Sequence, residues 1–439
     1  MLFALFFGAG NLIFPAQLGQ YAGENLWQGV IGFLTTGVGL PLLGIIAIAY
    51  SGSKNLQDLA SRVSPAYGLF FTALLYLTIG PFFAAPRTGT VAYEVGIMPF
   101  VPDDAQKIGL FIFTLIFFAI TLVFSLYPRK IVSNIGKILA PSLVFLLGVL
   151  LVTAFVNPMG PIGDAQSDYV EGAFVTGFLE GYNTMDALAS LVFAIIVINA
   201  IRSFGIINKG QILSITVRTG LLAIGLLAAI YIGISYLGAI SVEKLGLFET
   251  GGPVLSGTAT YYFGTIGSVL LAILIILACL TTAIGLVTAN AEYFNTLLPS
   301  ISYRVLVVFF STITFIIANF GLANIIAFSI PVLMFLYPLA IVLILLTFLS
   351  RFFNHARIVY VVTIAVTFLI AIVDGIIALS GELEVDFAFI NPVVVFFDRI
   401  LPFYIAGLGW LVPALITIVI TGIIAKIFNL STPVESSEN

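Results

Sequence analysis

Long apolar stretches separated by short polar segments run along the whole chain. A helix needs about 20 mostly apolar residues to cross the hydrocarbon core of a bilayer, and these stretches have that length. They lack the period-two alternation of polar and apolar residues that a transmembrane β-barrel requires. The pattern predicts an all-α integral membrane fold with about twelve transmembrane helices, at 2–21, 27–50, 66–97, 107–127, 131–156, 170–200, 212–239, 264–297, 302–320, 324–349, 356–380 and 400–428.

The first and sixth predicted helices are each interrupted by glycine and polar residues. The first break covers Gly8, Ala9, Gly10 and Asn11, and the second runs from Glu180 through Gly181 to Thr184. The two breaks lie five helices apart, as a five-plus-five inverted repeat predicts, and the substrate site of such carriers lies at their broken helices. We therefore expect one transmembrane domain over 1–439, with repeats at about 1–156 and 170–349 and two further helices over 356–428.

Composition supports the membrane assignment. The chain is 61% hydrophobic and 8% charged, whereas a soluble domain is about 25% charged. With the N-terminus inside, only Lys107, Lys244 and Arg399 lie outside and Arg87 lies within the membrane, while the other Lys and Arg residues are cytoplasmic. The positive-inside rule thus predicts a multi-pass protein of the cell (plasma) membrane with both termini in the cytoplasm.

Several functional classes are excluded by what the sequence lacks. No basic run exists, so nucleic acid is not a partner. The single Cys279 and single His355 cannot build a disulfide or a Cys/His metal site, and no zinc-protease motif or Walker glycine loop is present. We therefore expect neither an enzyme nor an ATP-driven pump.

The first apolar stretch has no basic lead and no small-residue cleavage site, so it is predicted to be a membrane helix and not a signal peptide. The residues before Gly8 rise only about 10 Å as a helix. This is short of half a bilayer core, and we expect the native start to lie upstream.

The first break has the chemistry of an anion site. Gly8 and Gly10 let the backbone open and approach a ligand, and the half-helix that follows presents free N–H groups to a carboxylate. Asn11 adds a side-chain oxygen or a donor. The alternative is close helix packing, for which membrane helices also use glycine.

The sixth helix places Glu180, Tyr182, Asn183, Thr184 and Asp186 in an otherwise apolar span. Charge inside a bilayer is costly and is usually paired or functional. At about 1.5 Å per residue, Arg87 of the third helix lies at a similar depth to Glu180. Arg87 is therefore predicted either to form an ion pair with Glu180 or Asp186, or to act in gating.

In the eighth helix, Thr281 and Thr282 follow Ala278 by three and four residues. Their hydroxyls, together with carbonyl oxygens, can form a small cage for a monovalent cation. The alternative is that each hydroxyl bonds a carbonyl of its own helix, as threonines in membrane helices usually do.

Three motifs together resemble one known family: FFGAGNLIFP at 6–15, GPFFAAPRT at 80–88 and GFLEGYNTMDALA at 177–189. They are similar to the bacterial branched-chain amino acid carriers, the leucine, isoleucine and valine cation symporters (LIVCS family), over essentially the whole chain. The resemblance implies a leucine-transporter fold within the amino acid, polyamine and organocation superfamily.

The resemblance also implies residue roles. Gly8 to Asn11 would hold the substrate carboxylate, and Gly181 to Thr184 its ammonium. The carbonyls of Ala4, Phe7 and Ala278, with the hydroxyls of Thr281 and Thr282, resemble a sodium site. This chain lacks the polar lead and longer first half-helix of the family, and Lys137 could instead place an ammonium near the cage, which keeps proton coupling open.

The expected function is symport of leucine, isoleucine and valine by alternating access, with sodium or protons as the coupling ion and no other cofactor. The expected partners are the substrate and the lipid bilayer. Two alternatives are a carrier for another small metabolite, such as a nucleobase, on the same architecture and, in a different class, an ion channel. A channel needs a continuous polar pore lining, which these helices do not supply.

Overall fold

The computed structural model describes residues 3, 6–127, 130–385, 387 and 389–430, except for the side chains of residues 130–140. Among these residues the regular elements are helices, and no strand occurs. Eight helical segments are long and apolar enough to cross a membrane, and three shorter apolar helices accompany them. The predicted all-α fold is confirmed.

The helices correspond to the twelve predicted stretches, several of them divided by short turns. The eighth begins earlier than predicted, at Gly251 and not at residue 264, where Gly264 has non-helical dihedral angles. The bounds of the helices are α2 Gly10–Ala22, α3 Leu26–Leu34, α4 Leu40–Ser51, α6 Pro65–Leu77, α7 Ala84–Gly96, α8 Gln106–Leu126, α9 Lys130–Val156, α10 Tyr169–Glu180, α11 Asp186–Ser203, α12 Lys209–Leu245, α13 Gly251–Leu297, α14 Tyr303–Ala318, α15 Leu322–Leu349, α16 Arg357–Leu383 and α18 Leu411–Ile427. Two further helices were not predicted, the short α5 Leu56–Ala60 and α17 Asn391–Ile400.

Irregular turns interrupt the second and third spans as well as the first and sixth. A π-helical turn at Thr35–Gly39 separates α3 from α4, and another at Thr78–Phe82 separates α6 from α7. The second of these contains Pro81, which cannot donate a backbone hydrogen bond, and Gly80, whose dihedral angles are not helical. Such single π turns inside helices are frequent at functional sites.

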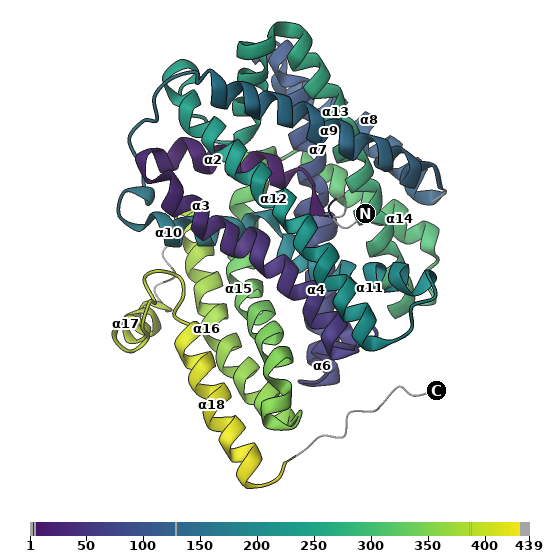
Figure 1. The fold of residues 1–439 in the computed structure, drawn as a ribbon, viewed down its shortest axis with the longest axis vertical. Helices are drawn as coiled ribbons and strands as arrows, with labels where there is room; N and C mark the ends of the chain where they lie inside the picture. Colours follow the sequence, from purple (N-terminus) through teal and green to yellow (C-terminus); the bar gives the residue numbers. More distant parts are fainter. Residues whose placement is uncertain (1–2, 4–5, 128–129, 386, 388, 431–439) are drawn as a thin grey trace. The chain divides into compact units, whose positions relative to one another are not determined.

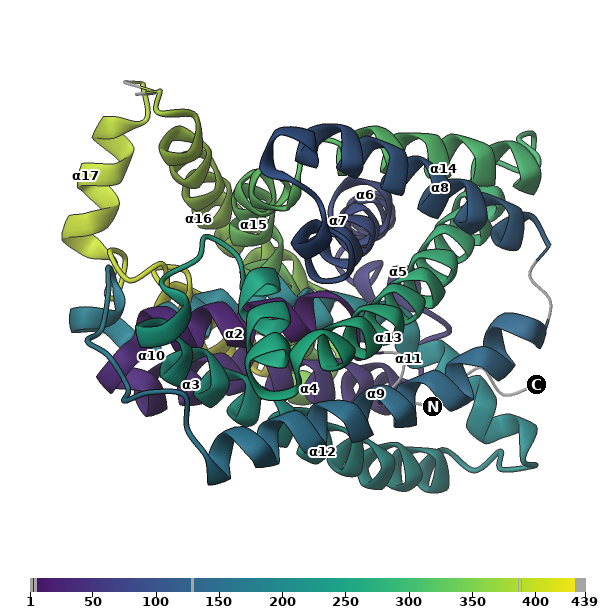
Figure 2. The ribbon, with the colours of Figure 1, turned by 90° about the horizontal axis from the view of Figure 1, so that it is seen from above.

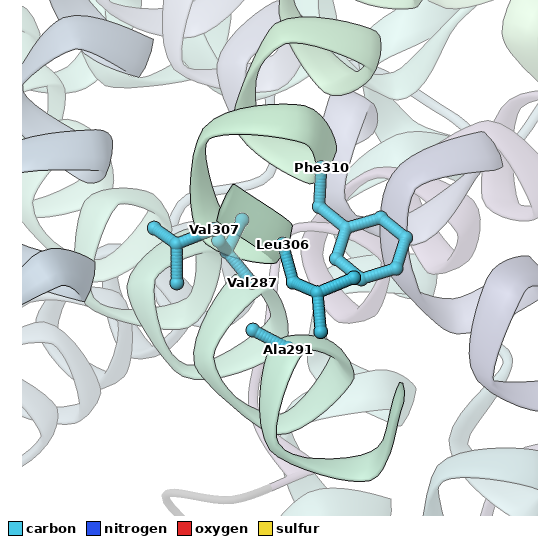
Figure 3. Close-up of a cluster of buried hydrophobic side chains, with 5 residues drawn as sticks. All are labelled: Val287, Ala291, Leu306, Val307 and Phe310. Atoms are coloured by element: carbon cyan, nitrogen blue, oxygen red, sulfur yellow. The ribbon is translucent and has the colours of Figure 1, made fainter. Parts of the chain in front are cut away.

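The chain forms two compact units. The first comprises residues 1–39, 76–186 and 221–326. Within it α13 packs along α7 and α10 along α3, while α8 and α14 run side by side (Figure 2). Five buried apolar residues join α13 to α14 (Figure 3): Val287, Ala291, Leu306, Val307 and Phe310.

Close backbone contact fixes α2 within this first unit. A Cβ atom at Gly251, the first residue of α13, would lie 1.9 Å from the carbonyl oxygen of Ile13. Only glycine permits this approach. The contact places the start of α13 directly against α2, the half-helix that follows the first break.

The second unit comprises residues 40–75, 187–220 and 327–439, of which the described part ends at residue 430. Within it α16 packs along α18 (Figure 1). The last helix begins at Leu411 because residues 401–410 form turns. Neither unit coincides with the repeats at about 1–156 and 170–349, which stay a prediction.

Candidate functional site

The first break lies immediately before α2. Phe7 and Gly8 are not helical, and Ala9 is the residue that caps α2. The backbone N–H of Gly8 donates to Asn11 Oδ1 at 3.0 Å, so the Asn11 side chain folds back over the break. Asn11 is 1% exposed and belongs to the first turn of α2. The predicted interruption of the first span is confirmed.

The second break separates α10 from α11. A 3₁₀ turn covers Gly181–Thr184, and Met185 then adopts a left-handed conformation with φ 59° before α11 begins at Asp186. A positive φ is uncommon for a residue with a side chain and persists only where its surroundings enforce it. Tyr182 is buried, and its ring packs edge-on against the ring of Phe178, with 5.7 Å between the ring centroids.

The two breaks lie in contact. Asn11 Nδ2 donates to Asp186 Oδ2 at 2.6 Å, across 175 residues of sequence. A Cβ atom at Gly10 would lie 3.6 Å from the Cα of Thr184. The two breaks therefore meet within the first unit, where Asn11, Thr184 and Asp186 form a buried polar cluster.

A third element, α12, supplies Tyr231 to this cluster. The Tyr231 hydroxyl donates to Asp186 Oδ2 at 2.9 Å, and Asn11 Nδ2 donates to the same hydroxyl oxygen. The sequence analysis did not identify Tyr231, because a tyrosine in a long apolar helix has the same pattern as an aromatic residue that only packs.

Arg87 of α7 also contacts the second break. It is 3% exposed, its Nη1 donates to the carbonyl oxygen of Asn183 at 2.7 Å, and its guanidinium lies 5.2 Å from the ring centroid of Phe14. Asn183 in turn donates from its side chain to Glu180 Oε2 at 3.0 Å. Asn183 thus links Arg87 to Glu180, the first of its two predicted partners.

The predicted cation cage lies beside the first break. The hydroxyls of Thr281 and Thr282 donate to the carbonyl oxygen of Ala278 at 2.9 and 3.0 Å. These bonds are the same-helix bonds of the alternative interpretation, and they also gather three oxygen atoms at one turn of α13. A Cβ atom at Gly8 would lie 3.7 Å from Cγ2 of Thr282.

Two predicted members of the site cannot be placed. Ala4 and the side chain of Lys137 lie outside the described residues. Phe7 is buried at the first break. No group of three or more His, Cys, Asp or Glu side chains that could hold a metal ion occurs in the part of the chain that the structure describes.

Apolar spanning helices and two broken helices in contact define a multi-pass membrane protein with the architecture of a secondary transporter. Two solved structures share its fold. An inward-facing conformation of Mhp1 aligns with a TM-score of 0.60 and 16% identity over 99% of this chain and 92% of that one. MhsT in complex with L-phenylalanine aligns with a TM-score of 0.54 and 15% identity over 84% of this chain and 97% of that one. The leucine-transporter fold is confirmed.

The chain belongs to the family of branched-chain amino acid transport proteins, whose model matches residues 1–428. The branched-chain amino acid permease BrnQ of Bacillus subtilis is 47% identical over 98% of this chain and 96% of its own. The branched-chain amino acid transport system 2 carrier protein of Pseudomonas aeruginosa is 41% identical over 96% of this chain and 93% of its own. BrnQ of Escherichia coli is 38% identical over the same shares. The predicted family is confirmed.

Proposed function

We propose that this protein imports leucine, isoleucine and valine into the cell by cation-coupled symport with alternating access. The observation that carries the proposal is the buried contact between the two helix breaks, through Asn11 and Asp186, in a chain of this family. Relatives named as branched-chain amino acid permeases support the choice of substrate.

The two breaks suit the two ends of an amino acid. The start of α2 offers backbone N–H groups to the carboxylate, because the first turn of a helix leaves its donors without intrahelical partners. The turn Gly181–Thr184 and the carboxylate beside it suit the ammonium. The branched side chain of the substrate has no polar group to satisfy, so apolar side chains are sufficient to line its pocket.

Uptake into proteoliposomes tests this function directly. We expect saturable leucine uptake that is driven by an imposed sodium or proton gradient and competed by isoleucine and valine. Counterflow of labelled leucine distinguishes a carrier from a channel. Uptake of a nucleobase without competition by leucine would assign the substrate to the other metabolite class and overturn the proposal.

Sodium coupling makes a specific prediction for Thr281. Replacing Thr281 with valine keeps the shape and removes one oxygen of the proposed cage, so the sodium concentration for half-maximal uptake should rise by about tenfold, the scale of one lost contact to a charged group. Because ion and substrate favour the same state, apparent leucine affinity at low sodium should fall with it. Leucine exchange at saturating sodium should change much less.

Thr258 provides the matched control, because it lies in the same helix and donates to the carbonyl of Leu255 at 3.0 Å, as Thr281 does to Ala278. Thr258→Val should leave sodium dependence unchanged. If protons are the coupling ion, a pH gradient should drive uptake in the absence of sodium. Thr281→Val should then leave uptake unchanged, and Lys137→Ala should uncouple uptake from the pH gradient.

We propose that both termini are cytoplasmic, on the strength of the Lys and Arg distribution. In a Cys279→Ala background, a Ser436→Cys variant should resist a membrane-impermeant maleimide in intact cells and react after permeabilisation. Asp103→Cys, at an exposed turn between the third and fourth spans, should react in intact cells. Labelling of residue 436 from outside would refute the orientation.

A further inference from the structure

Only one of the two carboxylate oxygens of Asp186 accepts a described hydrogen bond. It is the first residue of α11 and is 4% exposed. Both hydrogen bonds described for its carboxylate, from Asn11 and from Tyr231, end on the same oxygen, Oδ2. Within the described part of the chain, no hydrogen bond ends on Oδ1.

Both side chains that donate to this carboxylate, those of Asn11 and Tyr231, are neutral. No basic side chain among the described residues forms an ion pair with Asp186. Arg87 instead contacts Phe14 and the Asn183 carbonyl, at the preceding turn of the break. A carboxylate buried at this depth is a favourable partner for a cation, because the cation compensates the cost of desolvating its negative charge.

We propose that Oδ1 of Asp186 binds the α-ammonium of the transported amino acid, with Asn11 and Tyr231 as positioning residues. The proposal rests on the proposed function and names the group that recognises the ammonium. Asn11 belongs to the first turn of α2, whose N–H groups suit the carboxylate, and it donates directly to Asp186. The two binding groups are therefore adjacent, as the ammonium and carboxylate are on one α-carbon.

This assignment makes the ammonium a specificity determinant. A 2-hydroxy acid with the same side chain offers a neutral hydroxyl to Asp186 and leaves the buried carboxylate uncompensated. Purified protein should bind leucine far more tightly than 2-hydroxy-4-methylpentanoate. The ratio of the two affinities reports on Asp186, whereas a general loss of packing lowers both affinities together.

The test measures that ratio in variants. Asp186→Asn should weaken leucine binding by about 100-fold, the scale of a buried charge pair that loses one partner. Binding of the hydroxy acid should stay the same or tighten. Tyr231→Phe keeps the ring and removes one donor to Oδ2, so it should weaken leucine about tenfold and spare the hydroxy acid. Asp374→Asn, which removes a carboxylate from α16 in the second unit, is the control and should leave both affinities at wild-type values.

Equal losses for leucine and the hydroxy acid in Asp186→Asn and Tyr231→Phe would overturn the assignment. Loss of sodium or proton dependence with an unchanged ratio would also overturn it and would give Asp186 to the coupling ion. If Asp186→Asn does not fold, the ratio in Tyr231→Phe decides. A wild-type protein that binds none of leucine, isoleucine and valine would instead refute the proposed function.

Discussion

Replacement of Gly10 by valine should abolish leucine binding in a protein that still folds and inserts. A Cβ atom at this position would lie 3.2 Å from the Phe14 ring and 3.6 Å from the Cα of Thr184. The two γ-carbons of valine would therefore enter the contact between the breaks, and their rotation is restricted by β-branching. Overpacking of this kind costs about 1–3 kcal/mol. If the protein relieves that strain by moving the breaks out of the binding geometry, binding must restore it, and affinity falls by up to about 100-fold. A side chain in the ligand's own space adds to that loss.

The measurement is equilibrium binding of leucine to purified protein, with thermal unfolding to establish that the variant is folded. Gly225→Val in α12 is the matched control, because no atom lies within 4 Å of a Cβ built there. Gly10→Ala should lower leucine affinity less than Gly10→Val, because the atom nearest to the alanine Cβ is at the edge of the Phe14 ring, which can shift. Wild-type affinity in Gly10→Val would remove the first break from the substrate site.

The spans and the two principal breaks could be predicted because each leaves a local signal. Apolar length marks a span, and Gly8, Gly10 and Gly181 stand beside polar residues inside such a length. The π turn at Thr35–Gly39 leaves a weaker sequence signal, because its sequence TTGVG is also acceptable inside a membrane helix. This turn packs closely against the second break: a Cβ at Gly181 would lie 2.0 Å from Oγ1 of Thr36.

The contacts that build the site could be predicted only in part, because they join residues far apart in sequence. Depth along the helices placed Arg87 near the sixth span, and the structure brings it to the carbonyl of Asn183. A backbone acceptor cannot be recognised from side-chain chemistry, so a carboxylate was the expected partner. Tyr231 lies 220 residues from Asn11 and has no polar neighbour in sequence, so only the folded chain identifies it.

Removal of Arg87 is the second change for which we expect a large effect. Arg87→Met should lower the free energy of unfolding by about 3–5 kcal/mol, because it leaves buried polar and charged partners uncompensated. It takes the donor from the Asn183 carbonyl, and the Asn183 side chain holds Glu180. Transport should fall with it, since the turn at Gly181–Thr184 loses its contact with α7.

A double-mutant cycle identifies the partner. If Asn183 transmits the charge of Glu180 to Arg87, then Arg87→Met with Glu180→Gln should destabilise less than the sum of the single changes, by about 0.5–3 kcal/mol. Arg87→Met with Asp186→Asn should be closer to additive, because Asp186 is bonded to Asn11 and Tyr231 and not to Asn183. Additivity in both pairs would leave Arg87 without either predicted partner. Strong coupling to Asp186 alone would mean that the guanidinium supplies the cation that we assign to the substrate, so the same cycle also tests the ammonium site.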